Sequence, residues 1–122
     1  MKEYRNEKGE LHRTDGPALE DIIGKYWYIN YKRHRTDGPA VEYNNGYKEW
    51  WNNGQLHRTD GPAVESSDYK QWWINGKLHR LDGPAVEFPN GTKQWWINGI
   101  NYTEDQYQKE LIKLKLKRLI EL

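Results

Sequence analysis

Short apolar segments alternate with turn residues along most of this chain. The apolar segments are rich in Val, Trp, Tyr and Ile, which suit a pleated strand, and Asn-Gly or Asp-Gly-Pro sequences separate them. In residues 84–88, for example, Val86 and Phe88 point to one side of a strand while Ala85 and Glu87 point to the other. Asn-Gly favours a type I′ hairpin turn, whose two central residues need positive φ. The pattern therefore predicts a series of short β-hairpins.

The hairpin pattern repeats every 22 or 23 residues. Each unit begins with His-Arg-x-Asp-Gly-Pro-Ala, continues with an aliphatic residue and a glutamate, and ends, after a turn, in a Trp-rich segment. The Asp-Gly-Pro-Ala sequences start at Asp15, Asp37, Asp60 and Asp82, and the Trp-rich segments are 25–31, 48–54, 70–76 and 93–99. One unit alone could not bury its tryptophans, but stacked units could. We therefore expect an all-β fold in which tandem β-hairpin repeats form an extended antiparallel sheet or β-solenoid.

The N-terminal end of the array departs from the repeat. Before His12, the positions aligned with Trp50 and Trp51 hold Arg5 and Asn6. An edge strand with polar side chains is poorly suited to pairing with another chain. The sequence therefore predicts a half-repeat with a polar edge.

The C-terminal segment changes from strand spacing to helical spacing. Thr103 and Gln106 are separated as in a capping box, and Tyr107, Leu111 and Leu114 then recur at helical intervals. The sequence thus divides into four β-hairpin repeats over 1–102 and one amphipathic capping α-helix over 103–122.

The apolar stripe of this helix has two possible partners. It either covers the last hairpin or pairs with a second copy of itself, which would make a homo-oligomer through the C-terminal helix. The basic residues of the helix also fit a membrane surface, and they are Lys113, Lys115, Lys117 and Arg118. The capping box and the stripe follow directly from the last hairpin, which favours a capping or dimer helix over a membrane contact.

Composition narrows the class of protein. The chain has 122 residues, 35% of them hydrophobic and 30% charged, with 7 Trp, 9 Tyr and no Cys. Without cysteine there is no disulfide, zinc-thiolate site or thiol nucleophile. No stretch of apolar residues could span a membrane and no apolar leader segment is evident, so we expect a cytoplasmic protein with no membrane partner. The net charge of +1 gives no uniformly basic surface, although charges sorted into columns could create a basic face.

The tandem G…WxxNG pattern resembles MORN-type repeats, particularly the variant MORN class of YwqK-like proteins. The form HRxDGPA…G…WxxNG is similar to a subgroup of phage and large-virus proteins, and the resemblance covers residues 9–99. The usual Tyr-x-Gly opening of a MORN unit is replaced by HRxDGPA. The resemblance implies a β-hairpin solenoid used for binding, with no chemistry and no cofactor. A viral protein would act in the cytoplasm of its host.

Each unit places a histidine three residues before an aspartate, which raises the question of metal binding or catalysis. Equivalent histidines in a stack would lie about 10 Å apart, too far to share one metal. No Ser or Cys stands at a fixed place to serve as a nucleophile. We therefore interpret His and Arg as bracing a structural corner whose Asp accepts backbone N–H bonds and pairs with Arg. The residues of this corner are His34, Asp37, His57, Asp60, His79 and Asp82.

Adjacent tryptophans in each unit point to opposite sides of a strand, so two aromatic columns are expected. One column is expected to form the core, because aliphatic residues are few. The other would be half covered, either by Lys and Arg side chains or by a ligand. The candidate aromatic and cationic binding residues are Trp27, Trp50, Trp51, Trp72, Trp73, Trp95, Trp96, Arg35, Arg58 and Arg80.

Two functions fit these columns. The first is a non-enzymatic binding module that presents a repeated aromatic and cationic face to a protein partner. The second is a protein that binds or sequesters a nucleotide, stacking a small phosphorylated ligand or a nucleic acid on Trp, Arg and His. An enzyme is disfavoured because active sites need unlike neighbours and these groups recur in equivalent copies. The turns that differ between units form a further candidate recognition edge, and they are 21–24, 43–46, 66–69 and 88–91.

Overall fold

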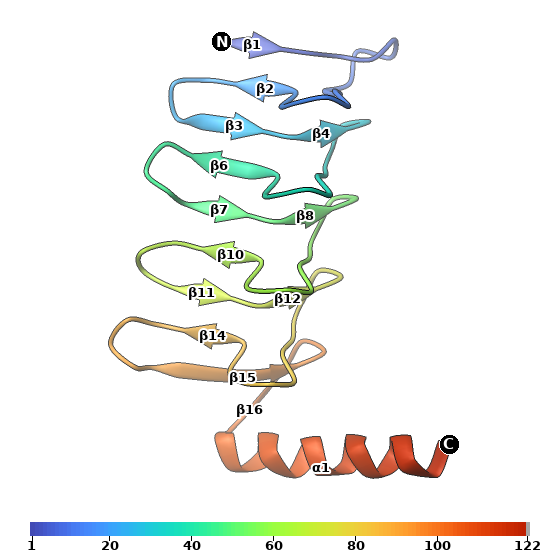
Figure 1. Ribbon diagram of the computed structural model, residues 1–122, viewed down its shortest axis with the longest axis vertical. Helices are drawn as coiled ribbons and strands as arrows, with labels where there is room; N and C mark the ends of the chain where they lie inside the picture. The colour runs from blue at the N-terminus through green and yellow to red at the C-terminus, as the bar shows by residue number, and fades with distance from the viewer. Residues whose placement is uncertain (122) are drawn as a thin grey trace.

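The computed structural model describes residues 1–121, which form a stack of β-hairpins closed by one helix (Figure 1). The strands of the main sheet are antiparallel neighbours, each hydrogen-bonded to the next. In spatial order they are β1 (Lys2–Glu3), β2 (Leu19–Glu20), β3 (Gly24–Tyr26), β6 (Val41–Tyr43), β7 (Lys48–Glu49), β10 (Val64–Glu65), β11 (Lys70–Gln71), β14 (Val86–Glu87), β15 (Lys93–Ile97) and β16 (Ile100–Tyr102). The predicted extended antiparallel sheet of hairpin repeats is confirmed.

A small side hairpin ends each of the first three units. These hairpins are β4 (Tyr28–Ile29) with β5 (Lys32–Arg33), β8 (Trp51–Asn52) with β9 (Gln55–Leu56), and β12 (Trp73–Ile74) with β13 (Lys77–Leu78). The His-Arg-x-Asp-Gly-Pro segment then connects each side hairpin to the next strand of the main sheet, and we call this segment the corner.

The ribbon is a single layer, as Figure 1 shows. Its accessible surface is 8273 Å², whereas a compact protein of this mass would expose about 6,900 Å². The buried core is made of small aliphatic residues: Ala18, Ala40, Ala63, Ala85, Val41, Val64 and Val86, with Leu11, Ile97 and Tyr107. Every tryptophan is only half-buried, so the expectation that one aromatic column forms the core was wrong. A single layer has no opposing layer with which to cover a ring as large as indole.

Three Asn-Gly turns have the predicted type I′ geometry. At Asn53-Gly54, Asn75-Gly76 and Asn98-Gly99, φ is 48° or 49° for Asn and 77–79° for Gly. In the other two, only the glycine has positive φ, 93° at Gly46 and 90° at Gly91. There the Asn side chain accepts the N–H of the residue two positions on, which favours a type I turn followed by a left-handed glycine.

The first strand is shifted by one residue from the predicted alignment. The Tyr4 N–H donates to the Ala18 carbonyl oxygen at 2.8 Å, just as the Trp50 N–H donates to that of Ala63 at 2.7 Å. Tyr4 and Arg5, not Arg5 and Asn6, therefore occupy the paired aromatic positions. The reason is one additional residue in the turn after Asn6, and the N-terminal unit consequently begins with an aromatic ring.

Helix α1 (Glu104–Glu121) lies across the end of the stack (Figure 1). The predicted capping box is present: the Gln106 N–H donates to Thr103 Oγ1 at 3.2 Å, and the Thr103 N–H donates to Gln106 Oε1 at 3.1 Å. Tyr107 is the buried residue of the helix, whereas Ile112, Leu116, Leu119 and Ile120 are exposed. The apolar stripe that includes Tyr107 therefore covers the last hairpin.

Candidate functional site

Arginine and aromatic side chains alternate along one face of the sheet. Each corner arginine lies over the ring of the preceding unit, with its Cζ 3.8–4.1 Å from the ring centroid. The pairs are Arg13 on Tyr4, Arg35 on Trp27, Arg58 on Trp50 and Arg80 on Trp72. We call this column the Arg–Trp stack. At these distances the guanidinium makes a cation–π contact with the ring.

The corner holds each arginine from several sides. In the third unit, Arg58 Nε donates to Asp60 Oδ1 at 2.8 Å, and Nη1 donates to the Pro62 carbonyl oxygen at 3.0 Å and to Glu65 Oε1 at 3.2 Å. Gly61 closes the loop against the guanidinium, since a Cβ there would lie 3.0 Å from Arg58 Cζ. The same bonds recur at Arg35 and Arg80. This geometry explains why each of these units contains Arg, Asp, Gly, Pro and Glu: Asp, Glu and the Pro carbonyl oxygen accept from the arginine, and Gly leaves room for it.

The aspartates of the corners are paired but exposed. The side chains of Asp15, Asp37 and Asp60 are each 83% exposed, and their arginine partners only 20–27%. The hydrogen bond from Arg58 lowers the pKa of Asp60, and Arg35 does the same to Asp37. Within residues 1–121, no backbone N–H of another residue donates to these carboxylates. The corner thus contains the expected Arg–Asp pair without the expected backbone bonds.

The histidines link the end of one side hairpin to the turn of the next and do not brace the corner. Nδ1 of His12, His34, His57 and His79 accepts, at 3.0 Å, the backbone N–H of the asparagine that begins the next hairpin turn. Burial lowers the pKa of His79, which favours the neutral form that this bond requires. In residues 1–121, no three His, Asp or Glu side chains are placed to hold a metal ion.

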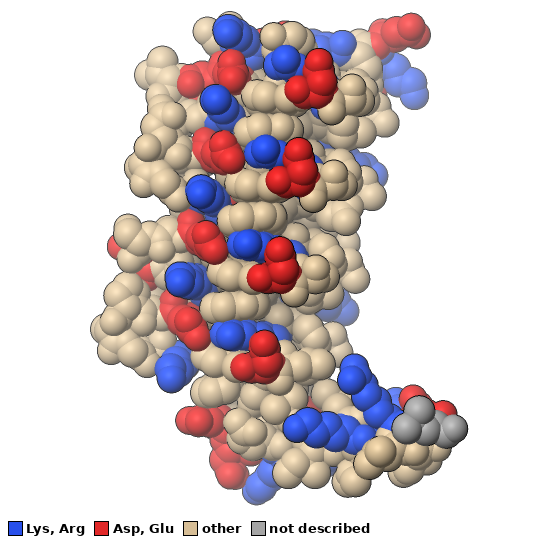
Figure 2. All heavy atoms as spheres, viewed as in Figure 1, with Lys and Arg blue, Asp and Glu red and all other residues tan. Residues whose placement is uncertain are grey.

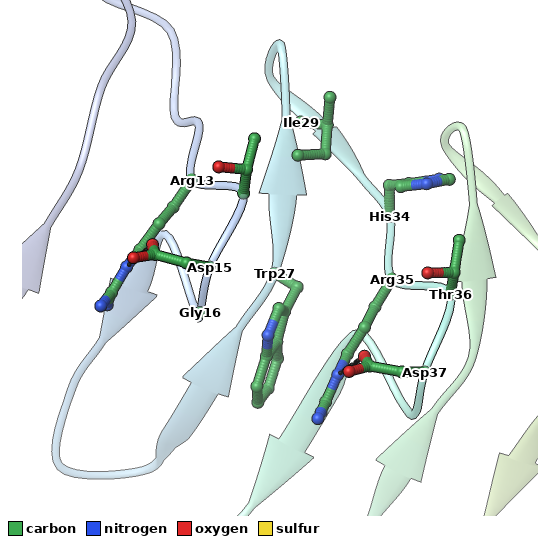
Figure 3. Close-up of a pocket in the computed structure, with 10 residues that line it drawn as sticks. Arg13, Asp15, Gly16, Trp27, Ile29, His34, Arg35, Thr36 and Asp37 are labelled. Carbon is green, nitrogen blue, oxygen red and sulfur yellow. Dashed lines mark hydrogen bonds and ion pairs between the residues drawn. The ribbon is translucent and has the colours of Figure 1, made fainter.

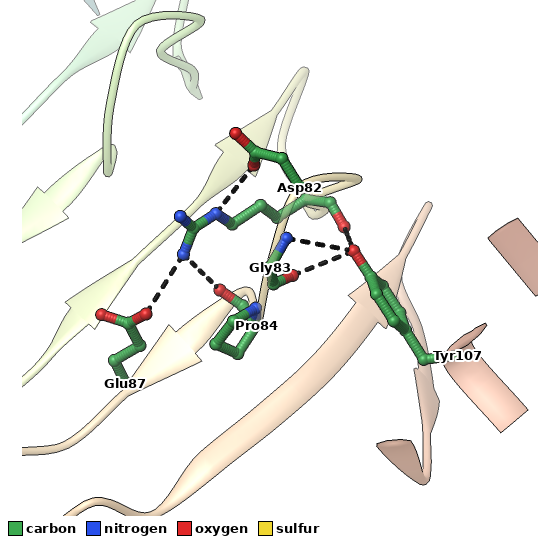
Figure 4. Close-up of polar contacts among 6 residues, drawn as sticks. Asp82, Gly83, Pro84, Glu87 and Tyr107 are labelled. Carbon is green, nitrogen blue, oxygen red and sulfur yellow. Dashed lines mark hydrogen bonds and ion pairs between the residues drawn. The ribbon is translucent and has the colours of Figure 1, made fainter. Parts of the chain in front are cut away.

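Tyr107 of helix α1 closes the Arg–Trp stack at its C-terminal end. The position of the next corner arginine is occupied by Thr103, and the Tyr107 ring lies 4.9 Å from that of Trp95 instead. Its hydroxyl donates to the Arg80 carbonyl oxygen at 2.6 Å and accepts the Gly83 N–H at 3.4 Å (Figure 4). Burial raises the pKa of this hydroxyl. The helix is therefore pinned to the last corner by one residue.

The two tryptophan columns are separated onto opposite faces of the sheet. Trp27, Trp50 and Trp72 each lie under a corner arginine, whereas Trp95, in the same column, lies against Tyr107. On the other face, Trp51 Nε1 donates to Glu49 at 2.8 Å, and Trp73 and Trp96 bond in the same way to Gln71 and Gln94. The candidate residues therefore do not form one aromatic and cationic face.

Lysine and glutamate alternate beside the Arg–Trp stack. The register pairs Glu42 with Lys25 and Lys48, and Glu65 with Lys48 and Lys70. Figure 2 shows this alternation as neighbouring blue and red side chains, with the corner aspartates in a second column. Opposite charges directly across a strand pair stabilise it slightly. This face is consequently not basic, because each cation has an acidic neighbour.

Clefts separate consecutive corners. The first has a volume of about 360 Å³ and lies between the corners of the first and second units, with Trp27 and Ile29 at its floor (Figure 3). The second, about 640 Å³, lies between the next two corners and is lined by both Trp50 and Trp51. Thr14, Thr36 and Thr59 line the cleft walls. Sequence reasoning did not select these threonines, although the variable position of His-Arg-x-Asp is Thr in three units.

The fold and the clefts define a single-layer β-hairpin repeat protein with two similar surface clefts between its first three corners. Comparisons with family models, curated proteins and solved structures give no match. The resemblance to MORN-type repeats stays a prediction. No helix within residues 1–121 has the length and apolar character needed to cross a bilayer.

Proposed function

We propose that this chain is a non-enzymatic binding module whose row of clefts receives a protein partner. The observation that carries the proposal is the occurrence of two similar clefts between the first three corners, each lined by tryptophan, threonine and aspartate. Concave sites with an aromatic floor and a few polar groups are typical of binding surfaces. Repeat proteins commonly bind along their length through such equivalent sites.

The pairing within each corner argues against catalysis. The corner arginine and aspartate engage each other, and each histidine holds a backbone N–H with Nδ1. In every unit these groups are engaged in hydrogen bonds that hold the fold together. An active site would instead need unlike titratable groups converging on one reacting atom.

The Arg–Trp stack argues against nucleotide binding, the second function considered. A base needs an open aromatic face, but Arg35 and Arg58 already lie over the rings of Trp27 and Trp50. We expect no quenching of tryptophan fluorescence when ATP is titrated to millimolar concentration. Saturable quenching would favour the nucleotide-binding function instead.

The binding function is tested by blocking the clefts. Thr36→Arg combined with Thr59→Arg places two long side chains at the walls of the second cleft, at exposed positions where the fold should tolerate them. Ser67→Arg combined with Gln108→Arg adds the same charge at exposed positions away from the clefts.

The wild-type protein and both variants would be used to capture proteins from a lysate of the cells in which the protein occurs, with quantification by mass spectrometry. We expect at least one protein whose capture is lost with the cleft variant and kept with the control variant. Equal capture by both variants, with unchanged melting temperatures, would refute a binding role for the clefts.

A further inference from the structure

The corner aspartates make the mouths of the clefts acidic. The side chains of Asp37 and Asp60 are 83% exposed and that of Asp82 is 87% exposed, whereas their arginine partners lie below them and are 19–21% exposed. Arginine bonds only the Oδ1 atom of each carboxylate, so Oδ2 remains available to a donor from outside. A ligand that approaches a cleft therefore meets the carboxylate before the guanidinium.

These carboxylates repeat at a fixed distance. Equivalent corners are separated by two strands of the main sheet, for example β6 and β7 between the second and third corners. Neighbouring strands are about 4.8 Å apart, so equivalent aspartates are separated by about 9.6 Å along the stack. Figure 2 shows the resulting row of acidic side chains along the molecule. A partner that uses several clefts together must carry its complementary groups at the same interval.

A polyproline II segment meets this requirement. Its side chains return to the same side every three residues, a rise of about 9.3 Å. A β-strand returns to the same side after about 6.7 Å, which does not match one unit. Only its third return, at about 20 Å, approaches the length of two units, so a strand would reach every second carboxylate at most. The side chains of an α-helix return to the same side after two turns, about 10.5 Å. Over three repeat units such a helix falls out of register with the aspartates by roughly 3 Å, whereas a polyproline II segment does so by about 1 Å.

The floors of the clefts point to the same kind of ligand. Trp27 and Trp50 line the first and second clefts. Arg35 and Arg58 each lie over one of these rings, but the half-buried indoles still present apolar surface to the clefts, and grooves lined by aromatic residues are the usual docking sites of proline-rich segments. We infer that the row of clefts binds a proline-rich segment in the polyproline II conformation, with Lys or Arg at every third residue facing the corner aspartates. This inference rests on the proposed function and specifies the chemistry of the partner.

The first test varies the spacing of charge in the ligand. Fluorescent peptides of (Pro-Pro-Lys)₄ would be compared, by anisotropy titration against the whole chain, with peptides of identical composition whose lysines stand every second residue or in one block. We expect the three-residue spacing to bind about tenfold more tightly, because only this spacing engages several carboxylates at once, and binding to weaken with added salt. Equal affinities for all spacings would refute the inference and indicate non-specific attraction.

The second test removes the charge from the protein. Asp37→Asn with Asp60→Asn keeps an oxygen that accepts from arginine, so the corners are retained while two negative charges are lost. Glu7→Gln with Asp68→Asn removes the same charge at exposed positions away from the row. We expect the first variant to bind (Pro-Pro-Lys)₄ at least fivefold more weakly and the control to bind almost normally. Equal weakening in both variants would contradict the inference.

The two proposals fail in different ways. If the cleft-blocking arginines abolish capture of a partner while (Pro-Pro-Lys)₄ does not bind, the clefts bind a protein of another chemistry and this inference is wrong. If neither the capture nor the peptide responds to changes in the clefts, both proposals are wrong.

Discussion

Removing one arginine from the middle of the Arg–Trp stack tests whether the stack stabilises the fold. Arg58→Ala deletes the guanidinium that covers Trp50 at 3.8 Å and bonds Asp60, Pro62 and Glu65. Arg33→Ala is the matched control, because Arg33 lies over Trp51 at the longer distance of 5.1 Å and has no such corner around it. Both changes remove one positive charge from an arginine over a tryptophan.

The structure allows the expected loss to be worked out. The Arg58 side chain is 20% exposed, and its cation–π contact with Trp50 contributes about 1 kcal/mol. The Pro62 carbonyl oxygen loses its donor, which costs about 1 kcal/mol. The ion pair to Glu65, whose side chain is only one-third exposed, contributes about 1 kcal/mol. Arg58→Ala should therefore lower the free energy of unfolding by about 3 kcal/mol, and Arg33→Ala by less than about 1 kcal/mol.

Urea unfolding followed by circular dichroism would measure both variants against the wild-type protein. The double variant Arg58→Ala with Trp50→Ala completes a thermodynamic cycle, and we expect a coupling of about 1 kcal/mol between the two side chains. A loss for Arg58→Ala no larger than that for the control would refute the stabilising role of the stack. Zero coupling would show that the guanidinium acts through the corner alone.

Three further predictions concern the cap, a strained turn and pH. Tyr107→Phe should destabilise the protein by about 1 kcal/mol through loss of the hydroxyl bonds, and Tyr107→Ala by about 4 kcal/mol through loss of the buried ring, both measured by urea unfolding. Tyr31→Gly should raise the melting temperature, because Tyr31 has φ of 68° at a position where other units have glycine; no increase would contradict strain there. The contribution of His79 should be complete above about pH 6.5 and decline as the pH falls through its lowered pKa, since protonation of Nδ1 breaks the bond to Asn98. His79→Asn keeps an acceptor that does not titrate, so its stability should fall less between pH 7 and 5.

Local signals in the sequence were sufficient to predict the elements. Asn-Gly at 53–54 and the capping box at Thr103 and Gln106 determine backbone geometry through residues next to each other in the chain, and both are present in the structure. The N-terminal alignment was wrong because one extra residue in a turn changes the register without changing the composition. Asn45-Gly46 was assigned the wrong turn type because the Asn45 side chain binds the Tyr47 N–H.

Contacts between stacked hairpins could not be predicted from the pattern of one hairpin. The sequence shows that each repeat contains a corner arginine and a tryptophan, but only the stacking of repeats places Arg58 over Trp50. The bond from His57 Nδ1 to the Asn75 N–H joins residues 18 positions apart and has no local signature. Tyr107 is part of a helical stripe in the sequence, and its role in covering Trp95 depends on where the helix lies.

The spacing of strands explains why arginine and tryptophan repeat together. Tryptophans of successive units are separated by about 9.6 Å, whereas aromatic rings in contact have centroids about 4.5–7 Å apart. Rings alone would therefore leave a gap in every unit, and a planar guanidinium is thin enough to occupy it, as Arg58 does above Trp50. Because the arginine must be held in place, each corner supplies an aspartate whose other oxygen faces outward. The need to fill a single-layer stack thus places a row of carboxylates at the clefts, where a partner can reach them.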